Sequence, residues 1–125
     1  MTPKFQVGID TIEIRRISEI LEKCPGFRHR WFNSNESLLS SKKMAGSLAA
    51  KKALYKSLGG QLYFDYSKVT LLHDEFGKPK FEFYDGGSFL NSHLCYSISI
   101  TYTTETAQAI AITQLSEAAS DDNLR

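Results

Sequence analysis

The N-terminal part of the chain changes its hydrophobic period once. Residues 4–10 alternate apolar and polar positions, which predicts a β-strand whose apolar residues share one face. The apolar residues of this face are Phe5, Val7 and Ile9. From residue 11 the period lengthens, and the apolar positions of residues 11–23 fall near one stripe, which predicts an amphipathic helix. Pro25 and Gly26 follow and are expected to end it.

A longer helix is predicted in the middle of the chain. Asn33 and Glu36 have the spacing of an N-cap residue and a returning carboxylate, so a new helix start is expected there. Residues 42–58 combine an apolar, small-residue face with several lysines, which predicts a helix that presents those lysines. Gly59 and Gly60 come directly after it and form a typical C-terminal stop.

The C-terminal half alternates like a set of strands. Val69–His73 is predicted to be a strand, and residues 76–79 a hairpin turn that leads into a return strand around Phe81. A short helical turn is expected over Phe89–His93. Two strands, Cys95–Thr101 and Ala107–Thr113, are apolar enough to suggest central positions in a sheet.

These elements predict an α+β fold, with a mainly antiparallel sheet packed against the long helix. Strands lie at both ends and in the middle of the chain, and the links within 69–83 and 95–113 are of hairpin length. At 125 residues the chain is expected to be a single domain. We expect this domain to span residues 1–115, with a flexible tail over 116–125 that carries little apolar surface.

Composition and charge exclude several classes of function. The chain is 42% hydrophobic with a net charge of +1, so no overall field attracts it to nucleic acid or to an anionic membrane. No apolar stretch approaches the length that a membrane-spanning helix needs. The two cysteines have no metal-binding or disulfide-framework spacing, which favours a reducing cytoplasm.

Candidate chemistry is concentrated in two segments. Asp10 ends the first predicted strand, and the helix of residues 42–58 carries Lys51, Lys52 and Lys56. A carboxylate at a strand end together with a basic helix suggests a site for a phosphorylated ligand. The structural alternative is that the lysines are solvated and that Asp10 only caps the strand.

The order of several short motifs resembles the holo-[acyl-carrier-protein] synthase family, the small phosphopantetheinyl transferases. The motifs are Gly8-Ile9-Asp10 with Ile12-Glu13-Ile14-x-Arg16-Ile17, Phe27-x-x-Arg30 with Asn33-x-x-Glu36, Ala45-Gly46-x-Leu48-Ala49-Ala50-Lys51, Lys56-x-x-Gly59, Gly77-Lys78-Pro79 and Ser97-Ile98-Ser99. Together they span roughly residues 5–114 at near-family spacing.

The resemblance implies an activity and a set of partners. Members of the family move 4′-phosphopantetheine from coenzyme A to a serine of an acyl carrier protein, with a divalent cation, usually magnesium, on the pyrophosphate. The resemblance implies that Asp10 is a metal-binding carboxylate, that the catalytic residues are Asp10, Lys51 and Lys52, and that Lys51, Lys56 and Gly59 bind coenzyme A.

The resemblance also implies a docking surface and an assembly. Arg16, Lys23 and Phe27 fall where the family contacts the acidic carrier protein. For Arg16 the structural alternative is an ordinary exposed arginine. Family members of this single-domain length form homotrimers whose sites lie between neighbouring subunits, so a homotrimer is expected.

One position carries the wrong charge for this chemistry. Lys52 stands where the family has a glutamate that binds the metal, and Ser47 stands where it has an arginine. Two unit charges about 4 Å apart at an effective dielectric of about 20 interact by about 4 kcal/mol, so Lys52 would repel a divalent ion by about 8 kcal/mol. We therefore expect no ordinary magnesium site.

Two interpretations of Lys52 stay open, and with them two functions. Lys52 pairs with Asp10 and silences the site, or its ammonium takes the place of the metal on the pyrophosphate; a third arrangement keeps the metal through water or Glu13. The expected function is coenzyme A and carrier-protein binding with impaired or altered transfer. The alternative is a non-catalytic paralogue that acts as a binding or partner subunit in a carrier-protein system.

Overall fold

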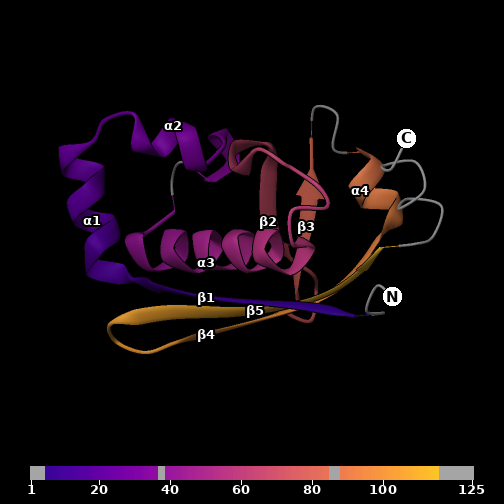
Figure 1. Ribbon diagram of the computed structural model, residues 1–125. Helices are drawn as coiled ribbons and strands as arrows, with labels where there is room; N and C mark the ends of the chain where they lie inside the picture. Colours follow the sequence, from indigo (N-terminus) through magenta and orange to yellow (C-terminus); the bar gives the residue numbers. More distant parts are fainter. Residues whose placement is uncertain (1–4, 37–38, 85–87, 116–125) are drawn as a thin grey trace.

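The computed structural model describes residues 5–36, 39–84 and 88–115, and it has the predicted α+β architecture (Figure 1). In chain order the elements are β1 (Gln6–Glu13), α1 (Ile14–Lys23), α2 (Phe27–Trp31), the 3-10 turn η1 (Ser34–Glu36), α3 (Ser41–Leu58), the 3-10 turn η2 (Tyr66–Lys68), β2 (Val69–His73), β3 (Pro79–Phe83), α4 (Ser88–His93), β4 (Leu94–Tyr102) and β5 (Thr106–Leu115). The expected tail lies outside the described residues.

The strands form two antiparallel sheets. The larger has the order β1-β5-β4, with Asp10 of β1 opposite Ala109 of β5, and the smaller is the β2–β3 hairpin. The prediction that both C-terminal strands are central is wrong for one of them. β5 is central because β1 pairs with its free side, whereas β4 is an edge strand of this sheet. Apolar content alone did not distinguish the two positions.

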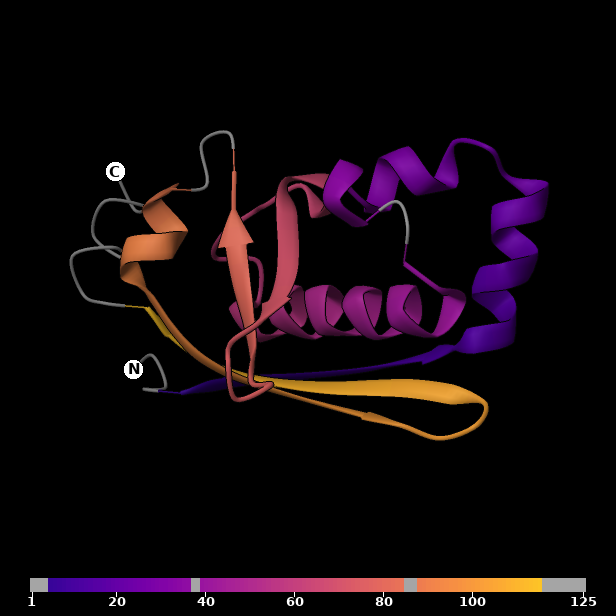
Figure 2. The same cartoon turned by 180° about the vertical axis from the view of Figure 1, so that it is seen from behind.

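Helix α3 lies between the larger sheet and a second layer made by α2 and the β2–β3 hairpin (Figures 1 and 2). Its ends agree with the prediction. The side chain of Ser40 accepts a hydrogen bond from the Lys43 amide, and Gly59 ends the helix in the left-handed conformation at φ 60°. The face of α3 that meets the sheet is rich in alanine, so the helix backbone can approach the strands closely.

Residues 11–13 extend the first strand, where a helix was predicted. Ile12 pairs with Ala107 and Glu13 with Thr106, and these backbone hydrogen bonds hold the segment in the sheet. The helix begins only at Ile14. Its buried side chain, Ile17, packs into a smaller hydrophobic cluster near the start of α3.

The capping pattern at Asn33 forms, but it begins only one turn. The Asn33 amide donates to Glu36 Oε1 at 3.3 Å, and the Asn35 amide donates to Asn33 Oδ1 at 2.9 Å. The first is the returning contact that the spacing predicts, whereas the Asn33 side chain caps the Asn35 amide in place of the Glu36 amide. The segment they stabilise is the short turn η1, because Glu36 is drawn into the interior by a second set of partners described below.

The predicted apolar face of β1 is the outer face of the sheet. Phe5, Val7 and Ile9 are 65%, 63% and 59% exposed. Across the ladder they continue into Ile110 and Ile112 of β5, which are opposite Ile9 and Val7. The inner face of β1 carries Gly8, where α3 packs. Within the part of the chain that the structure describes, no helix is long and apolar enough to cross a membrane.

Candidate functional site

Asp10 and Lys56 form the first part of the candidate site, at the contact between β1 and α3. The Lys56 ammonium lies 2.7 Å from Asp10 Oδ1 and also donates to the Ile9 carbonyl at 3.2 Å. The Asp10 side chain is largely buried, whereas more than half of the Lys56 side chain is exposed. The second carboxylate oxygen, Oδ2, is buried and accepts no hydrogen bond from the described residues.

Of the interpretations left open for Lys52, the ion pair with Asp10 is wrong. Asp10 pairs with Lys56, one turn further along α3. Lys52 points instead toward α2, where its ammonium lies 5.6 Å from the centre of the Trp31 ring. Among the described residues, no carboxylate lies within ion-pairing distance of Lys52.

Lys52 stands at the edge of a cavity of about 310 Å³ between β1, α1, α2 and α3. The interior of the cavity is mainly apolar, with three charged side chains among its lining residues. The lining residues are Thr11, Ile12, Glu13, Arg16, Ile17, Ile20, Phe27, Trp31, Leu48 and Lys52. Such a mixture suits an amphipathic ligand with an anionic end.

The expected carrier-protein contacts lie around this cavity. Arg16 and Phe27 line it, together with Lys52. Lys23 lines a neighbouring hollow of about 320 Å³ that shares Arg16 with the first. The fold therefore brings all three predicted contact residues to the region around α1.

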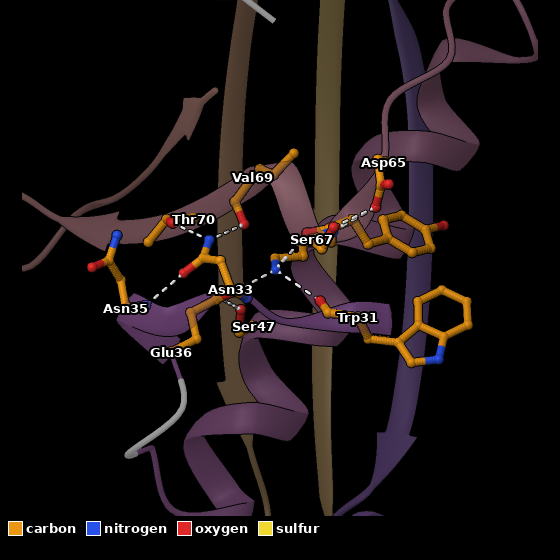
Figure 3. A network of polar contacts seen from close by, with 11 residues as sticks. Trp31, Asn33, Asn35, Glu36, Ser47, Asp65, Ser67, Val69 and Thr70 are labelled. Atoms are coloured by element: carbon orange, nitrogen blue, oxygen red, sulfur yellow. Dashed lines mark hydrogen bonds and ion pairs between the residues drawn. The ribbon is translucent and has the colours of Figure 1, made fainter. Parts of the chain in front are cut away.

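Lys51 does not face this site, which corrects the expectation that it binds a ligand phosphate. Its side chain is completely buried. Its ammonium donates to Glu36 Oε1 at 2.6 Å and to the carbonyls of Trp31 and Tyr66 at 3.1 and 2.9 Å (Figure 3). An ammonium has three hydrogens, so no donor is left for a ligand.

Burial is also the main influence on the pKa of the Lys51 ammonium. Desolvation lowers the pKa of its ammonium, and the charge and hydrogen bond of Glu36 oppose this shift by raising it. The pair therefore acts as an internal cross-link. It joins α3 to the backbone of α2 and η2, and it does not contribute positive charge to the surface.

Glu36 is the residue whose role the sequence did not reveal. Its Oε2 atom accepts a hydrogen bond of 2.5 Å from Ser47 Oγ, and both residues are buried. Asn33 extends the network to β2 by donating to the Val69 carbonyl (Figure 3). The capping pattern identified Glu36 as a local cap, but no sequence signal indicated a partner 15 residues away.

Three aromatic rings pack against one another near the lysines of α3, and the sequence analysis assigned them no role. Trp31 and Tyr66 lie 4.9 Å apart between ring centres, and Tyr55 packs against Tyr66 at 5.7 Å. Burial raises the pKa of the Tyr66 hydroxyl to about 12. The signal that was available was the aromatic and basic composition of residues 27–32.

Gly59, the remaining predicted binding residue, ends α3 one turn after Lys56. Its amide is engaged in the helix cap, donating to the Lys56 carbonyl at 3.2 Å. A side chain added at Gly59 would meet nothing within 4 Å, so the surface beside it is open. A binding role for Gly59 stays a prediction.

The residues at this site do not fit a divalent cation. Magnesium prefers several oxygen ligands. Here one oxygen of Asp10 is engaged by Lys56, and Lys52 occupies the position of the expected second carboxylate. Across residues 5–36, 39–84 and 88–115, no group of three or more histidine, cysteine, aspartate or glutamate side chains could hold a metal ion.

Comparisons with known proteins agree with this fold and with the motifs. The holo-[acyl-carrier-protein] synthase of Alkaliphilus oremlandii is 36% identical over 118 residues, which cover 85% of this chain and 97% of that protein. The crystal structure of a holo-(acyl-carrier-protein) synthase from Bacillus anthracis in complex with CoA (3′,5′-ADP) is 26% identical. It has a TM-score of 0.70 over 89% of this chain and 96% of that one.

A more distant structure shows the same fold. The holo-[acyl-carrier-protein] synthase from Neisseria meningitidis is 21% identical, with a TM-score of 0.75 over 87% of this chain and 97% of that one. The sequence model of the 4′-phosphopantetheinyl transferase superfamily matches residues 6–113. The resemblance drawn from the motifs is confirmed: the chain belongs to the holo-[acyl-carrier-protein] synthase family of the 4′-phosphopantetheinyl transferase superfamily.

Proposed function

We propose that this protein binds coenzyme A and an acyl carrier protein, and that it transfers 4′-phosphopantetheine to a serine of the carrier with altered efficiency. The observation that carries this proposal is the partly exposed side chain of Lys56, which pairs with Asp10 and lies one helical turn from Lys52, a residue that lines the cavity. The relative from Bacillus anthracis, whose structure contains CoA (3′,5′-ADP), supports coenzyme A as the ligand.

In the proposed reaction the carrier serine oxygen attacks the phosphorus that bears the pantetheine arm. The bond from this phosphorus to the bridging oxygen breaks, 3′,5′-ADP leaves, and the serine proton passes to solvent or to a nearby base. Charge neutralisation and positioning dominate such transfers. Lys56 would contact the diphosphate, and the cavity lined by Phe27 and Trp31 would receive the pantetheine arm.

The carrier protein would dock on α1. Arg16 lines the cavity, and Lys23, on the same helix, lines the neighbouring hollow. Positive side chains here suit an acidic carrier. Both cysteines are free, which suits a cytoplasmic setting for this reaction.

The outer face of the larger sheet supports the proposed homotrimer. Large apolar side chains are exposed on two neighbouring strands of this face and directly before the first of them: Phe5, Val7, Ile9, Ile110 and Ile112. A contiguous apolar patch on a sheet is typical of a protein interface. Ile9 precedes Asp10, so a second copy bound to this face would also approach the candidate site.

The alternative function is that of a non-catalytic binding subunit. The observation that favours it is the inversion of charge at Lys52, together with the complete burial of Lys51. Coenzyme A and carrier binding would then persist while transfer is lost. This protein would act as a partner in a carrier-protein system.

A transfer assay distinguishes the two functions. The purified protein is incubated with coenzyme A, magnesium and an apo acyl carrier protein, and the carrier is analysed by intact-mass spectrometry. The enzyme proposal predicts a gain of one phosphopantetheine, which Lys56→Ala should slow by about tenfold or more through loss of a charge-assisted phosphate contact. Lys43→Ala, at an exposed position of α3, is the matched control. Normal coenzyme A binding without transfer would support the alternative.

A further inference from the structure

We infer that this protein binds the diphosphate of coenzyme A without a divalent cation, through Lys52 and Lys56, and that Trp31 positions the Lys52 ammonium. The inference rests on the proposed function and concerns the same site. It starts from the disagreement between these residues and the metal that the family uses.

The residue at position 52 changes the net charge of the site. Exchanging a glutamate for a lysine adds two positive charges, which is the charge of one divalent cation. A site with two carboxylates, one lysine and a divalent ion has a formal net charge of +1. Asp10, Lys52 and Lys56 together also have a formal net charge of +1. The substitution therefore preserves the net charge that a diphosphate would meet, with the metal left out.

The Lys52 ammonium is available to an anionic ligand. Lys52 and Lys56 are four residues apart on α3, so their side chains leave the same face of the helix. Asp10 pairs with Lys56, whereas the Lys52 ammonium lies over the Trp31 ring and has no carboxylate partner among the described residues. The cation–π contact with this partly buried ring is weaker than the charge-assisted hydrogen bonds that a phosphate accepts. Lys52 can therefore turn from the indole to an anion at little cost.

Trp31 is held in place through both its ring and its backbone carbonyl. Its ring packs on Tyr66 at 4.9 Å, and its carbonyl accepts a hydrogen bond from the buried Lys51 ammonium (Figure 3). Two consecutive lysines thus act on the same residue. Lys51 fixes the backbone of Trp31 from inside, and Lys52 rests on its ring from outside. Trp31 is a positioning residue that keeps the Lys52 ammonium near the diphosphate position.

The test measures coenzyme A binding with and without metal. Trp31 is the chain's single tryptophan, so its fluorescence reports on the site, and calorimetry gives an independent Kd. We expect Kd in EDTA to be within about threefold of Kd in excess magnesium, because the lysine pair supplies the neutralising charge. Binding that appears only with magnesium overturns the inference and leaves the proposed function intact. Failure to bind under both conditions contradicts the proposed function itself.

Variants at Lys52 make the test sharper. Lys52→Glu restores the family's carboxylate, so binding in EDTA should weaken by about tenfold or more and magnesium should recover it. Lys52→Gln should lose the binding in EDTA without recovery by magnesium. Lys43→Glu makes the same charge change at an exposed position near the start of α3 and should leave the ratio of the two Kd values unchanged. A Lys52→Glu variant that binds equally well in EDTA overturns the inference.

The role of Trp31 is tested by calorimetry in EDTA. Trp31→Leu should weaken binding, and Trp31→Phe should recover part of it, because the conservative variant keeps an aromatic face for the ammonium. In the Lys52→Gln background, Trp31→Leu should cause little further loss, since the two residues act as a unit. Equal losses in both backgrounds would show that Trp31 is only structural.

Discussion

At the scale of single residues, Lys51 and Lys52 are chemically identical neighbours with opposite environments. They differ by one position along α3. The Lys51 side chain points into the interior and contacts Glu36, whereas the Lys52 side chain points outward and contacts the ring of Trp31. Breaking a buried ion pair by removing one partner leaves an uncompensated charge in a low-dielectric interior.

Glu36→Gln is expected to lower the free energy of unfolding by about 3–5 kcal/mol, because it leaves the buried Lys51 ammonium without its counter-charge. Urea denaturation followed by circular dichroism measures the change. Lys51→Met added to Glu36→Gln should recover part of the loss, since it removes the orphaned charge. Glu82→Gln, at an exposed position of β3, is the control. A loss no larger than that of the control would mean that the pair is solvated.

At the scale of elements, the contact between α3 and β1 brings Asp10 to Lys56. It depends on small residues, since a Cβ atom at Gly8 would lie 2.0 Å from the Ala53 carbonyl oxygen. That oxygen belongs to the helix backbone, which cannot move aside as a side chain would. The close approach therefore requires glycine at this position, and the geometry of the candidate site depends on it.

Gly8→Ala is expected to destabilise the fold by about 3 kcal/mol, at the upper end of overpacking effects, because the strand and helix backbones must separate. Thermal and urea unfolding measure the effect. The matched control is Gly26→Ala, where a new Cβ would meet nothing within 4 Å and the expected change is below about 1 kcal/mol. If both variants were equally stable, the strand and helix would have room that this structure does not show.

At the scale of the whole molecule, the larger sheet is covered by α3 on one side and exposes an apolar surface on the other. Val7 and Ile112 face each other in the ladder and are both exposed. The hydrophobic period that predicted β1 therefore describes an outward face, which a second copy of the chain would cover in the proposed trimer. The consequence can be tested without disturbing the monomer's own core.

Val7→Glu is expected to shift the protein from a trimer to smaller species, because it places a charge within the proposed apolar interface. Sedimentation velocity and light scattering give the mass. Thr104→Glu, in the exposed turn between β4 and β5, introduces the same charge away from this face and should leave the mass unchanged. A wild-type protein that sediments as a monomer, or a Val7→Glu variant that stays trimeric, would contradict the proposal.

The sequence by itself determined the class of the long helix and of the main strands, and it determined the family. The stop at Gly59, the hairpin of β2 and β3 and the hydrogen bond from the Asn33 amide to Glu36 follow from interactions between residues close together in the chain. Such local preferences act before any tertiary contact forms, so periodicity and capping patterns reveal them. The ordered motifs predicted the family through their resemblance to those of its members.

Only the tertiary structure decided which charges meet and which faces are covered. Asp10 pairs with Lys56, which is 46 residues away in the chain, and Lys51 pairs with Glu36, which is 15 residues away. Strand β4 lies at an edge because β5 pairs with β1 on its other side. A lysine's environment depends on the element packed over its helix face, and a one-residue step along α3 turns it by about 100°. The local sequence pattern carries no information about that packing, so the environments of Lys51 and Lys52 are decided only by how α3 packs in the tertiary structure.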